Sequence, residues 1–373
     1  MSIFSSSNIQ TFFKLLRAGL WEKDARLSQY KDIDYSAVMR LAEEQSVVGL
    51  VAAGMEHVTD MKLPKDDLLQ FVGQALQLEQ RNKAMNQFLA GIIEKLRKEG
   101  VYALLLKGQG IAQCYERPLW RASGDVDLFL SNDNYKNAVN VLTPLANEVE
   151  DENIYTKHIG FKIDKWEVEL HGSLRSELWE RLDNMLDEVQ EEIFNGGAVR
   201  SWMDGSTQMF MPRVDEDVLY VFAHILQHFF KGGIGLRQIC DWCRLIYTYR
   251  DSLNYGLLGS RVRKAGIMTE WKVFATLAVD YLGMPGGYMP LYDGSNKWQK
   301  KADRLLEFVL ETGNFGHGRD MSYRNEESSI PRKWKTFYHI TSDTFKQFAI
   351  FPMDSIRVWW RIMRGGLLTL VGK

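Results

Sequence analysis

The sequence predicts an α+β protein: a small mixed β-sheet with its own helices, flanked by helical regions on its N-terminal and C-terminal sides. Two observations predict this class. Apolar residues recur at three- and four-residue spacing through residues 1–95 and again through 206–373. Between these regions, in residues 96–205, short continuous or alternating apolar runs are typical of strands. With 373 residues and no internal repeat, the chain is long enough for two or three subdomains.

The N-terminal region is predicted to be helical throughout residues 1–95. The segments "YSAVMRLAEEQSVVGLVAAGM" and "KDDLLQFVGQALQLEQRNKAMNQFLAGIIEKLRKEG" both have helical spacing. Asp66 and Asp67 place negative charge where a helix begins, and the basic stretch before Gly100 indicates its end. A long helix should therefore lead directly into the sheet.

The central region, residues 96–205, is predicted to hold the sheet. "VYALLL" is typical of a strand buried on both faces, and "GDVDLFLS" follows after a short helix. "HIGFKIDKWEVELHG" alternates twice around Asp164-Lys165, which indicates a β-hairpin. From "SELWERLDNMLDEVQEEIF" onward we expect the chain to be helical again, including the strongly amphipathic "DEDVLYVFAHILQHFFKG" and "GLRQICDWCRLIYTYRDSL".

Composition restricts the class of protein further. A net charge of -2 argues against a surface built for nucleic acid. The three cysteines, Cys114, Cys240 and Cys243, are too few for a disulfide framework and favour a reducing compartment. The sequence contains neither an export signal nor an apolar run long enough to span a membrane. We therefore expect a cytoplasmic location.

The clearest chemical signal is the pair Asp125 and Asp127 on one strand. Because side chains alternate along a strand, both carboxylates share a face, with Cα atoms about 6.6 Å apart. At about 5 Å and an effective dielectric constant near 20, two such charges repel by about 3 kcal/mol. A cation between them relieves this repulsion, and rigid oxygen ligands suit Mg²⁺. The pair alone is weak evidence, since alternating acids also occur on the solvated face of edge strands.

Two motifs next to the aspartates strengthen the functional interpretation. In "LLLKGQG" a buried strand leads through Gly108 and Gly110 into a helix, an arrangement that offers backbone N–H groups to an anion beside Lys107. It is not a Walker A loop, whose residue order is absent. "WRASG" adds Arg121 and the Ser123 hydroxyl just before Asp125. Both motifs would place phosphate-binding groups at the mouth of the strand.

A third motif, "WEVELHG", places Glu167, Glu169 and His171 on one face of the second hairpin strand. A carboxylate from a neighbouring strand would complete a two-metal site, in which the ions clamp the attacking and leaving oxygens of an in-line phosphoryl displacement.

Taken together, the pattern strand–Lys-Gly–helix–Arg-x-x-Gly-Asp-x-Asp–strand, followed by a strand ending in acid-Leu-His, resembles the nucleotidyltransferase-5 family. These are bacterial members of the DNA polymerase β-like nucleotidyltransferase superfamily. The resemblance covers residues 104–174 and extends through "DEDVLYVFAHILQHFFKGGIGLRQICDWCRLI". It implies a nucleotidyltransferase-like core that moves a nucleotidyl group from a nucleoside triphosphate to a hydroxyl or phosphate acceptor. That acceptor could be a small molecule, a sugar, a protein side chain or an RNA end.

The resemblance also implies roles for individual residues. Asp125 and Asp127 would hold the metals at a two-metal Mg²⁺ site, with Mn²⁺ as an alternative ion. Glu169 would be the third ligand and help to deprotonate the acceptor, with Glu167 as the fallback. Lys107-Gly108 stands where the superfamily usually has Gly-Ser or Gly-Gly. The residues expected to bind substrate are Lys107, Gly108, Gly110, Arg121, Ser123 and His171.

Two pairs of residues on the later helices allow several interpretations. His224 and His228 lie four apart and could bind zinc, but the intervening sequence lacks the Glu of a zinc protease motif. A structural or cleft-facing role is therefore favoured. Arg237 and Asp241 most simply form an intrahelical pair, with a place beside the substrate as the alternative.

Two rival functions would also be compatible with these motifs. A non-catalytic scaffold or sensor that binds nucleotide or metal would share the fold, although it would be expected to lose its acids. A DxD-type glycosyltransferase is disfavoured because the residues before the motif are helical.

The basic tail, residues 331–373, contains Arg357, Arg361 and Arg364 on one helical face. It could contact a membrane surface or an anionic partner, although packing of Trp359 and Trp360 onto the helical region is favoured.

Overall fold

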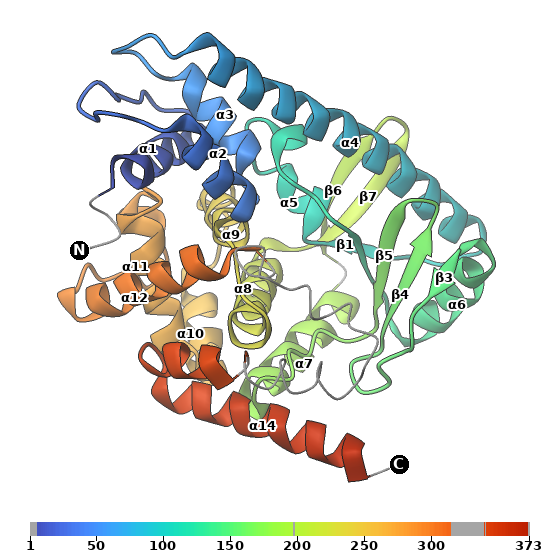
Figure 1. Cartoon of the computed structure of the whole chain (residues 1–373). Helices are drawn as coiled ribbons and strands as arrows, with labels where there is room; N and C mark the ends of the chain where they lie inside the picture. The colour runs from blue at the N-terminus through green and yellow to red at the C-terminus, as the bar shows by residue number, and fades with distance from the viewer. Residues whose placement is uncertain (1–5, 197, 315–338, 340, 372–373) are drawn as a thin grey trace.

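The computed structural model describes residues 6–196, 198–314, 339 and 341–371. In this part of the chain a seven-stranded mixed sheet lies beside a large group of helices, and one long helix runs along both (Figure 1). The predicted α+β class is confirmed.

The N-terminal helices are α1 (Ser7–Trp21), α2 (Tyr35–Glu44), α3 (Val48–Glu56) and α4 (Lys65–Lys98). Helices α1 and α3 are in backbone contact, because a side chain at Gly19 would overlap the Leu50 carbonyl and one at Gly54 the Leu15 carbonyl. The predicted charges are confirmed on α4, which has Asp66 and Asp67 in its first turn and three basic residues in its last.

Helix α4 joins the two parts of the molecule. It packs on α3, and Phe71 and Ala75 near its N-terminal end belong to the hydrophobic core of the helical part. Its C-terminal half contributes Met85, Leu89, Ile92, Ile93 and Leu96 to the same hydrophobic core as the strands. The predicted boundary at residues 95/96 thus falls at the end of a helix that covers the sheet.

The strands are β1 (Leu104–Leu106), β2 (Val126–Phe129), β3 (Glu148–Val149), β4 (His158–Ile163), β5 (Trp166–His171), β6 (Val199–Asp204) and β7 (Thr207–Pro212). Their order is β3-β4-β5-β2-β1-β7-β6. The pairs β2/β5 and β1/β7 are parallel and the other pairs antiparallel. The short α5 (Gly108–Ala112), α6 (Asn132–Leu142) and α7 (Glu180–Asn195) connect them. The predicted hairpin around Asp164-Lys165 is confirmed as β4–β5.

The expectation of helix throughout the chain after residue 177 is wrong for residues 199–212, which form the β6–β7 hairpin. The reason that these residues form a hairpin is visible in the sequence. Asp204-Gly205 is a strong hairpin turn signal, and Gly205 has a φ of 57°. Alternate residues Thr207, Met209 and Met211 point into the core. The predicted boundary at 205/206 falls in the turn of this hairpin.

The C-terminal helices are α8 (Val214–Lys231), α9 (Leu236–Thr248), α10 (Tyr255–Ala265), α11 (Met268–Asp280), α12 (Asn296–Thr312) and α14 (Pro352–Val371). The glycines between α8 and α9 separate them as predicted. Aromatic residues Phe222, Trp242, Trp271 and Phe274 contact one another in their core. The same core includes α1 and α3, so both helical regions form one hydrophobic interior.

The basic tail is described only from residue 341 onward, apart from residue 339. On α14, Arg357 pairs with Asp354 and Arg361 approaches Asp183 of α7 at 3.8 Å. Trp359 is partly buried, whereas Trp360 is 66% exposed, so the favoured packing of both tryptophans is wrong for Trp360. Contact with a membrane surface or an anionic partner stays a prediction. Among the described helices, none is both long and apolar enough to cross a membrane.

A carboxyl pair between α11 and α14, in which Glu270 is buried and Asp354 is partly buried, should make stability depend on pH. Burial, together with the hydrogen bond and charge of Asp354, raises the pKa of Glu270 to about 8 from an ordinary value of 4.5. Glu270 therefore stays protonated to a higher pH in the folded protein than in the unfolded chain. Its contribution to stability is complete below the unfolded pKa and is lost as the pH rises through the folded pKa.

We therefore expect the melting temperature of the wild type, relative to Glu270→Gln, to fall by several degrees between about pH 5 and about pH 9. Calorimetry across this range measures the difference. Exposed Glu99, replaced by Gln, is the matched control and should show little pH-dependent change. A constant difference between wild type and Glu270→Gln would contradict the expectation.

Candidate active site

The predicted carboxylates come together where β2 and β5 run side by side. In this parallel pair Asp127 lies directly opposite Glu169, and Asp125 immediately precedes β2. Carboxylate oxygens of the three residues lie within 4.8 Å of one another. Glu167, the fallback ligand, is exposed. The structure therefore brings together the three acids that the sequence singled out.

Lys107 occupies the sharp turn between β1 and α5. Its backbone has φ 48° and ψ −140°, and Gly108 follows with φ 42°. The Lys107 Nζ lies 2.9 Å from Asp127 Oδ1, and the Lys107 side chain is only 12% exposed. Burial disfavours its charge, but the attraction of Asp127 outweighs burial and raises the Lys107 pKa. The ammonium is thus a fixed positive charge beside the acids.

Gly110 has a packing role. It is buried in α5, and a side chain there would reach within 2.7 Å of Met211 Sδ on β7. Gly108 lines the pocket beside the acids, whereas Gly110 is not among the lining residues of that pocket. The structure therefore separates these two predicted substrate-binding glycines.

Two histidines hold the carboxylates in place. His171 Nε2 lies 2.8 Å from Asp127 Oδ1 and 3.5 Å from Glu169 Oε2. His158, its direct cross-strand partner on β4, lies 3.1 Å from Glu169 Oε2. Burial lowers the His171 pKa, but the hydrogen bonds to Asp127 and Glu169 outweigh it and raise the pKa overall.

The sequence prediction missed His158, although the signal was present. A hairpin with its turn at Asp164-Lys165 pairs residue 158 with residue 171. The ligand atoms of His158, Glu169 and His171 also lie within 4.8 Å of one another.

The three acids differ in their electrostatic environments. The charge of Asp127, followed by burial, raises the pKa of Asp125. Burial opposes ionisation of Asp127, but Lys107 and the His171 hydrogen bond outweigh it and lower the Asp127 pKa. Hydrogen bonds from both histidines similarly lower the pKa of Glu169 against the effect of burial. Of the three carboxylates, Asp125 therefore has the negative charge that is least compensated by neighbouring groups of the protein.

Helices α8 and α9 form the opposite wall of a partly open pocket with an empty volume of about 650 Å³. Its lining consists of Lys107, Gly108, Ile111, Arg121, Asp125, Asp127, Glu169, Val221, His224, Ile225, His228, Arg237, Gln238 and Asp241.

The histidine pair on α8 faces this pocket. His224 Nε2 lies 3.3 Å from Lys107 Nζ and 2.8 Å from His228 Nε2. Burial and nearby Lys107 lower the pKa of His228 to about 3 and that of His224 well below its usual value. Both imidazoles are therefore neutral. Among the described residues neither belongs to a group of three suitable metal ligands, and the pair takes the cleft-facing position that was favoured over zinc.

Arg121 joins the sheet region to α9. Its guanidinium contacts Asp241 through Nε at 3.1 Å and NH2 at 2.6 Å, and both side chains are 5% exposed. Tyr115 also donates to Asp241, and Ser123 Oγ accepts from Arg121. The Ser123 hydroxyl therefore supports Arg121, and Ser123 is not among the lining residues of the pocket.

Asp241 has a partner besides Arg237, the residue four positions earlier on α9, whose pKa is lowered by burial and raised by the charge of Asp241. Its carboxylate pairs with Arg121, which is distant in sequence. Arg237 donates to the Ala122 carbonyl at 2.8 Å. Both residues line the pocket, and a place beside the substrate stays a prediction.

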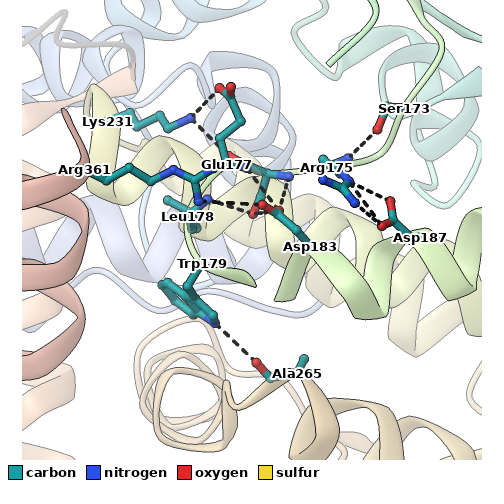
Figure 2. Close-up of polar contacts among 11 residues, drawn as sticks. Ser173, Arg175, Glu177, Leu178, Trp179, Asp183, Asp187, Lys231, Ala265 and Arg361 are labelled. Atoms are coloured by element: carbon teal, nitrogen blue, oxygen red, sulfur yellow. Dashed lines mark hydrogen bonds and ion pairs between the residues drawn. The ribbon is translucent and has the colours of Figure 1, made fainter. Parts of the chain in front are cut away.

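The segment that follows His171 makes polar contacts with α7 and α8 (Figure 2). Asp183 of α7 accepts hydrogen bonds from the backbone N–H groups of Ser176 and Glu177. Lys231, at the end of α8, contacts the Ser176 carbonyl at 3.0 Å and the Glu177 carboxylate at 3.2 Å. These contacts position α8, with its histidines, relative to the strand that carries Glu169.

A family model described as an uncharacterised nucleotidyltransferase matches residues 31–283, which include every candidate site residue named above. Neither the curated proteins nor the solved structures contain a match to this chain.

Proposed function

Because the chain belongs to this nucleotidyltransferase family, we propose that it moves a nucleotidyl group from a nucleoside triphosphate to a hydroxyl or phosphate acceptor. We further propose that Asp125, Asp127 and Glu169 bind Mg²⁺ for this reaction. The observation that carries the proposal is the register of β2 against β5, which places Asp127 opposite Glu169. Asp125 lies close to both, so that the three carboxylates form one cluster.

The donor set fits a hard divalent cation. Three carboxylates offer oxygens, the ligand type that Mg²⁺ prefers, from rigid strands. The raised pKa of Asp125 arises mainly from the charge of Asp127, and a cation between them would remove this mutual repulsion. The contacts of His158 and His171 to Glu169 and Asp127 orient the ligands, as outer hydrogen-bond partners of metal sites do.

In the proposed reaction the acceptor oxygen forms a bond to the α-phosphorus, and the bond from that phosphorus to the pyrophosphate oxygen breaks. Bound Mg²⁺ supplies electrostatic stabilisation of the charge on the phosphoryl oxygens. When the acceptor is a hydroxyl, the ionised Glu169 carboxylate can accept a hydrogen bond from it and take up its proton as the new bond forms, while pyrophosphate leaves with the electrons of the broken bond. Neutral His224 and His228 offer further polar contacts from the opposite wall.

Calorimetric titration of ATP, GTP, CTP and UTP, each with and without Mg²⁺, tests this function. We expect Mg²⁺-dependent binding of at least one nucleotide, weakened at least ~10-fold in Glu169→Gln, which loses a charged ligand. Glu167→Gln is the matched control, because Glu167 is an exposed acid two residues away on the same strand. Absence of nucleotide binding to the folded wild type would contradict the proposal.

A further inference from the structure

We propose that the Lys107 ammonium permanently takes the place of one of the two cations, so that the carboxylate site binds a single divalent ion. This inference rests on the proposed function, because it concerns the metal site of that reaction. It differs from the expectation of a two-metal site, and it assigns Lys107 to the carboxylates in place of the substrate phosphates.

The contacts of Lys107 are those of a built-in cation. Its Nζ lies 2.9 Å from Asp127 Oδ1 and 3.3 Å from His224 Nε2, and it is 6.0 Å from the centre of the Tyr220 ring. Neutral His224 can accept a hydrogen bond from the ammonium, and the face of an aromatic ring attracts a cation. The ammonium is thus held on several sides by groups from β2 and α8.

The backbone at Lys107 is consistent with this role. A φ of 48° with a ψ of −140° is a conformation that residues with side chains rarely adopt. Glycine would adopt it without strain, and the chain has glycine at the next position. Strain of this kind persists where the surrounding structure enforces it, commonly at functional sites. The turn therefore directs a lysine side chain at Asp127 despite a conformational cost.

The available ligand atoms also favour one ion. Asp127 Oδ1 already contacts two donors, Lys107 Nζ at 2.9 Å and His171 Nε2 at 2.8 Å. Only Oδ2 of Asp127 can bind an ion without displacing one of them. A second ion that bridged to Oδ1 would lie against the ammonium, and like charges at such distances repel strongly.

Charge balance supports the same conclusion. Asp125, Asp127 and Glu169 carry three negative charges when ionised. Lys107 supplies one positive charge and a single divalent ion supplies two, which together neutralise the three acids. A second divalent ion would leave two uncompensated positive charges before substrate arrives.

The test is electron paramagnetic resonance of Mn²⁺ bound to the full-length protein, with and without α,β-methylene-ATP as a probe that cannot transfer its nucleotidyl group. Two Mn²⁺ ions about 4 Å apart give a spin-coupled spectrum, whereas one ion gives the spectrum of an isolated centre. We expect one isolated ion per chain in the wild type. Lys107→Met, which removes the ammonium, should bind a second ion and show spin coupling.

Lys272→Met is the matched control. Lys272 of α11 is also a partly buried, ion-paired lysine, but its partner is Asp293, which is not among the residues of the site. It should retain one isolated ion. Circular dichroism checks that each variant is folded, and if Lys107→Met does not fold, the wild-type spectrum still decides.

Two coupled ions in the wild type would overturn the inference and leave the proposed function intact. A single ion in folded Lys107→Met would also overturn it, because Lys107 would then not be what excludes the second ion. No bound Mn²⁺ in the folded wild type would contradict both the inference and the proposed metal requirement.

Discussion

Replacing Asp125 with Asn should raise the free energy of unfolding of the metal-free protein by about 1 kcal/mol, while weakening its binding of Mn²⁺ at least ~100-fold. The charge of Asp127 is the largest influence on the pKa of Asp125, and burial adds to it. In the absence of metal the charged Asp125 carboxylate therefore lowers the free energy of unfolding. Asn has nearly the same shape, lacks the charge and loses the anionic ligand.

Denaturant unfolding in the presence of a chelator measures the first effect, and Mn²⁺ titration measures the second. Glu167→Gln provides the comparison, since that exposed acid should change neither quantity by much. Lower stability of Asp125→Asn in the absence of metal would show that attraction of Asp125 to Lys107 and Arg237 outweighs repulsion by Asp127. Retained Mn²⁺ affinity would remove Asp125 from the ligand set.

Replacing Arg121 with Met should lower the free energy of unfolding by about 3–5 kcal/mol. Arg121 and Asp241 are each 5% exposed and joined by two contacts. Loss of the guanidinium would leave a buried carboxylate without its charge partner, which costs far more than loss of a surface ion pair. The pair also connects the segment before β2 to α9, so its loss should loosen the wall of the pocket.

The double variant Arg121→Met/Asp241→Asn separates the ion pair from simple packing. Removing both charges should restore at least half of the lost stability, and Asn can still accept the hydrogen bond from Tyr115. Arg117 is the control, because its pair with Glu56 has similar contacts but is 31% and 44% exposed. Arg117→Met should cost less than ~1 kcal/mol. Equal losses for Arg121→Met and Arg117→Met would contradict the assignment.

Much of the site could be predicted from short-range sequence patterns. Alternation along a strand places Asp125 and Asp127 on one face, and the hairpin turn at Asp164-Lys165 fixes the orientation of Glu169. These are local consequences of strand geometry. The sequence alone does not specify that β2 and β5 are neighbours, and the observed register brings Glu169 opposite Asp127.

The remaining features depend on contacts between distant parts of the chain. The ion pair of Arg121 with Asp241 joins residues 120 positions apart, and helical spacing suggested the nearer Arg237 as its partner. The direction of the Lys107 side chain depends on an unusual backbone conformation at a single residue. The β6–β7 hairpin is different, because its Asp204-Gly205 turn and the alternation of its strands are local sequence signals. The neighbouring acidic helix nevertheless suggested a longer helical region.

Helix α4 has a consequence for any truncated form of the protein. Arg81 and Asn82 donate to the carbonyls of Ser123 and Arg121, in the segment that leads into Asp125. Later residues of the helix cover the apolar face of the sheet. A chain shortened to begin after residue 98 would expose that face to solvent and lose both donors beside the acids. The smallest fragment that retains an intact site should therefore include α4, and proteolysis within α4 should disrupt the site even where every carboxylate is left in place.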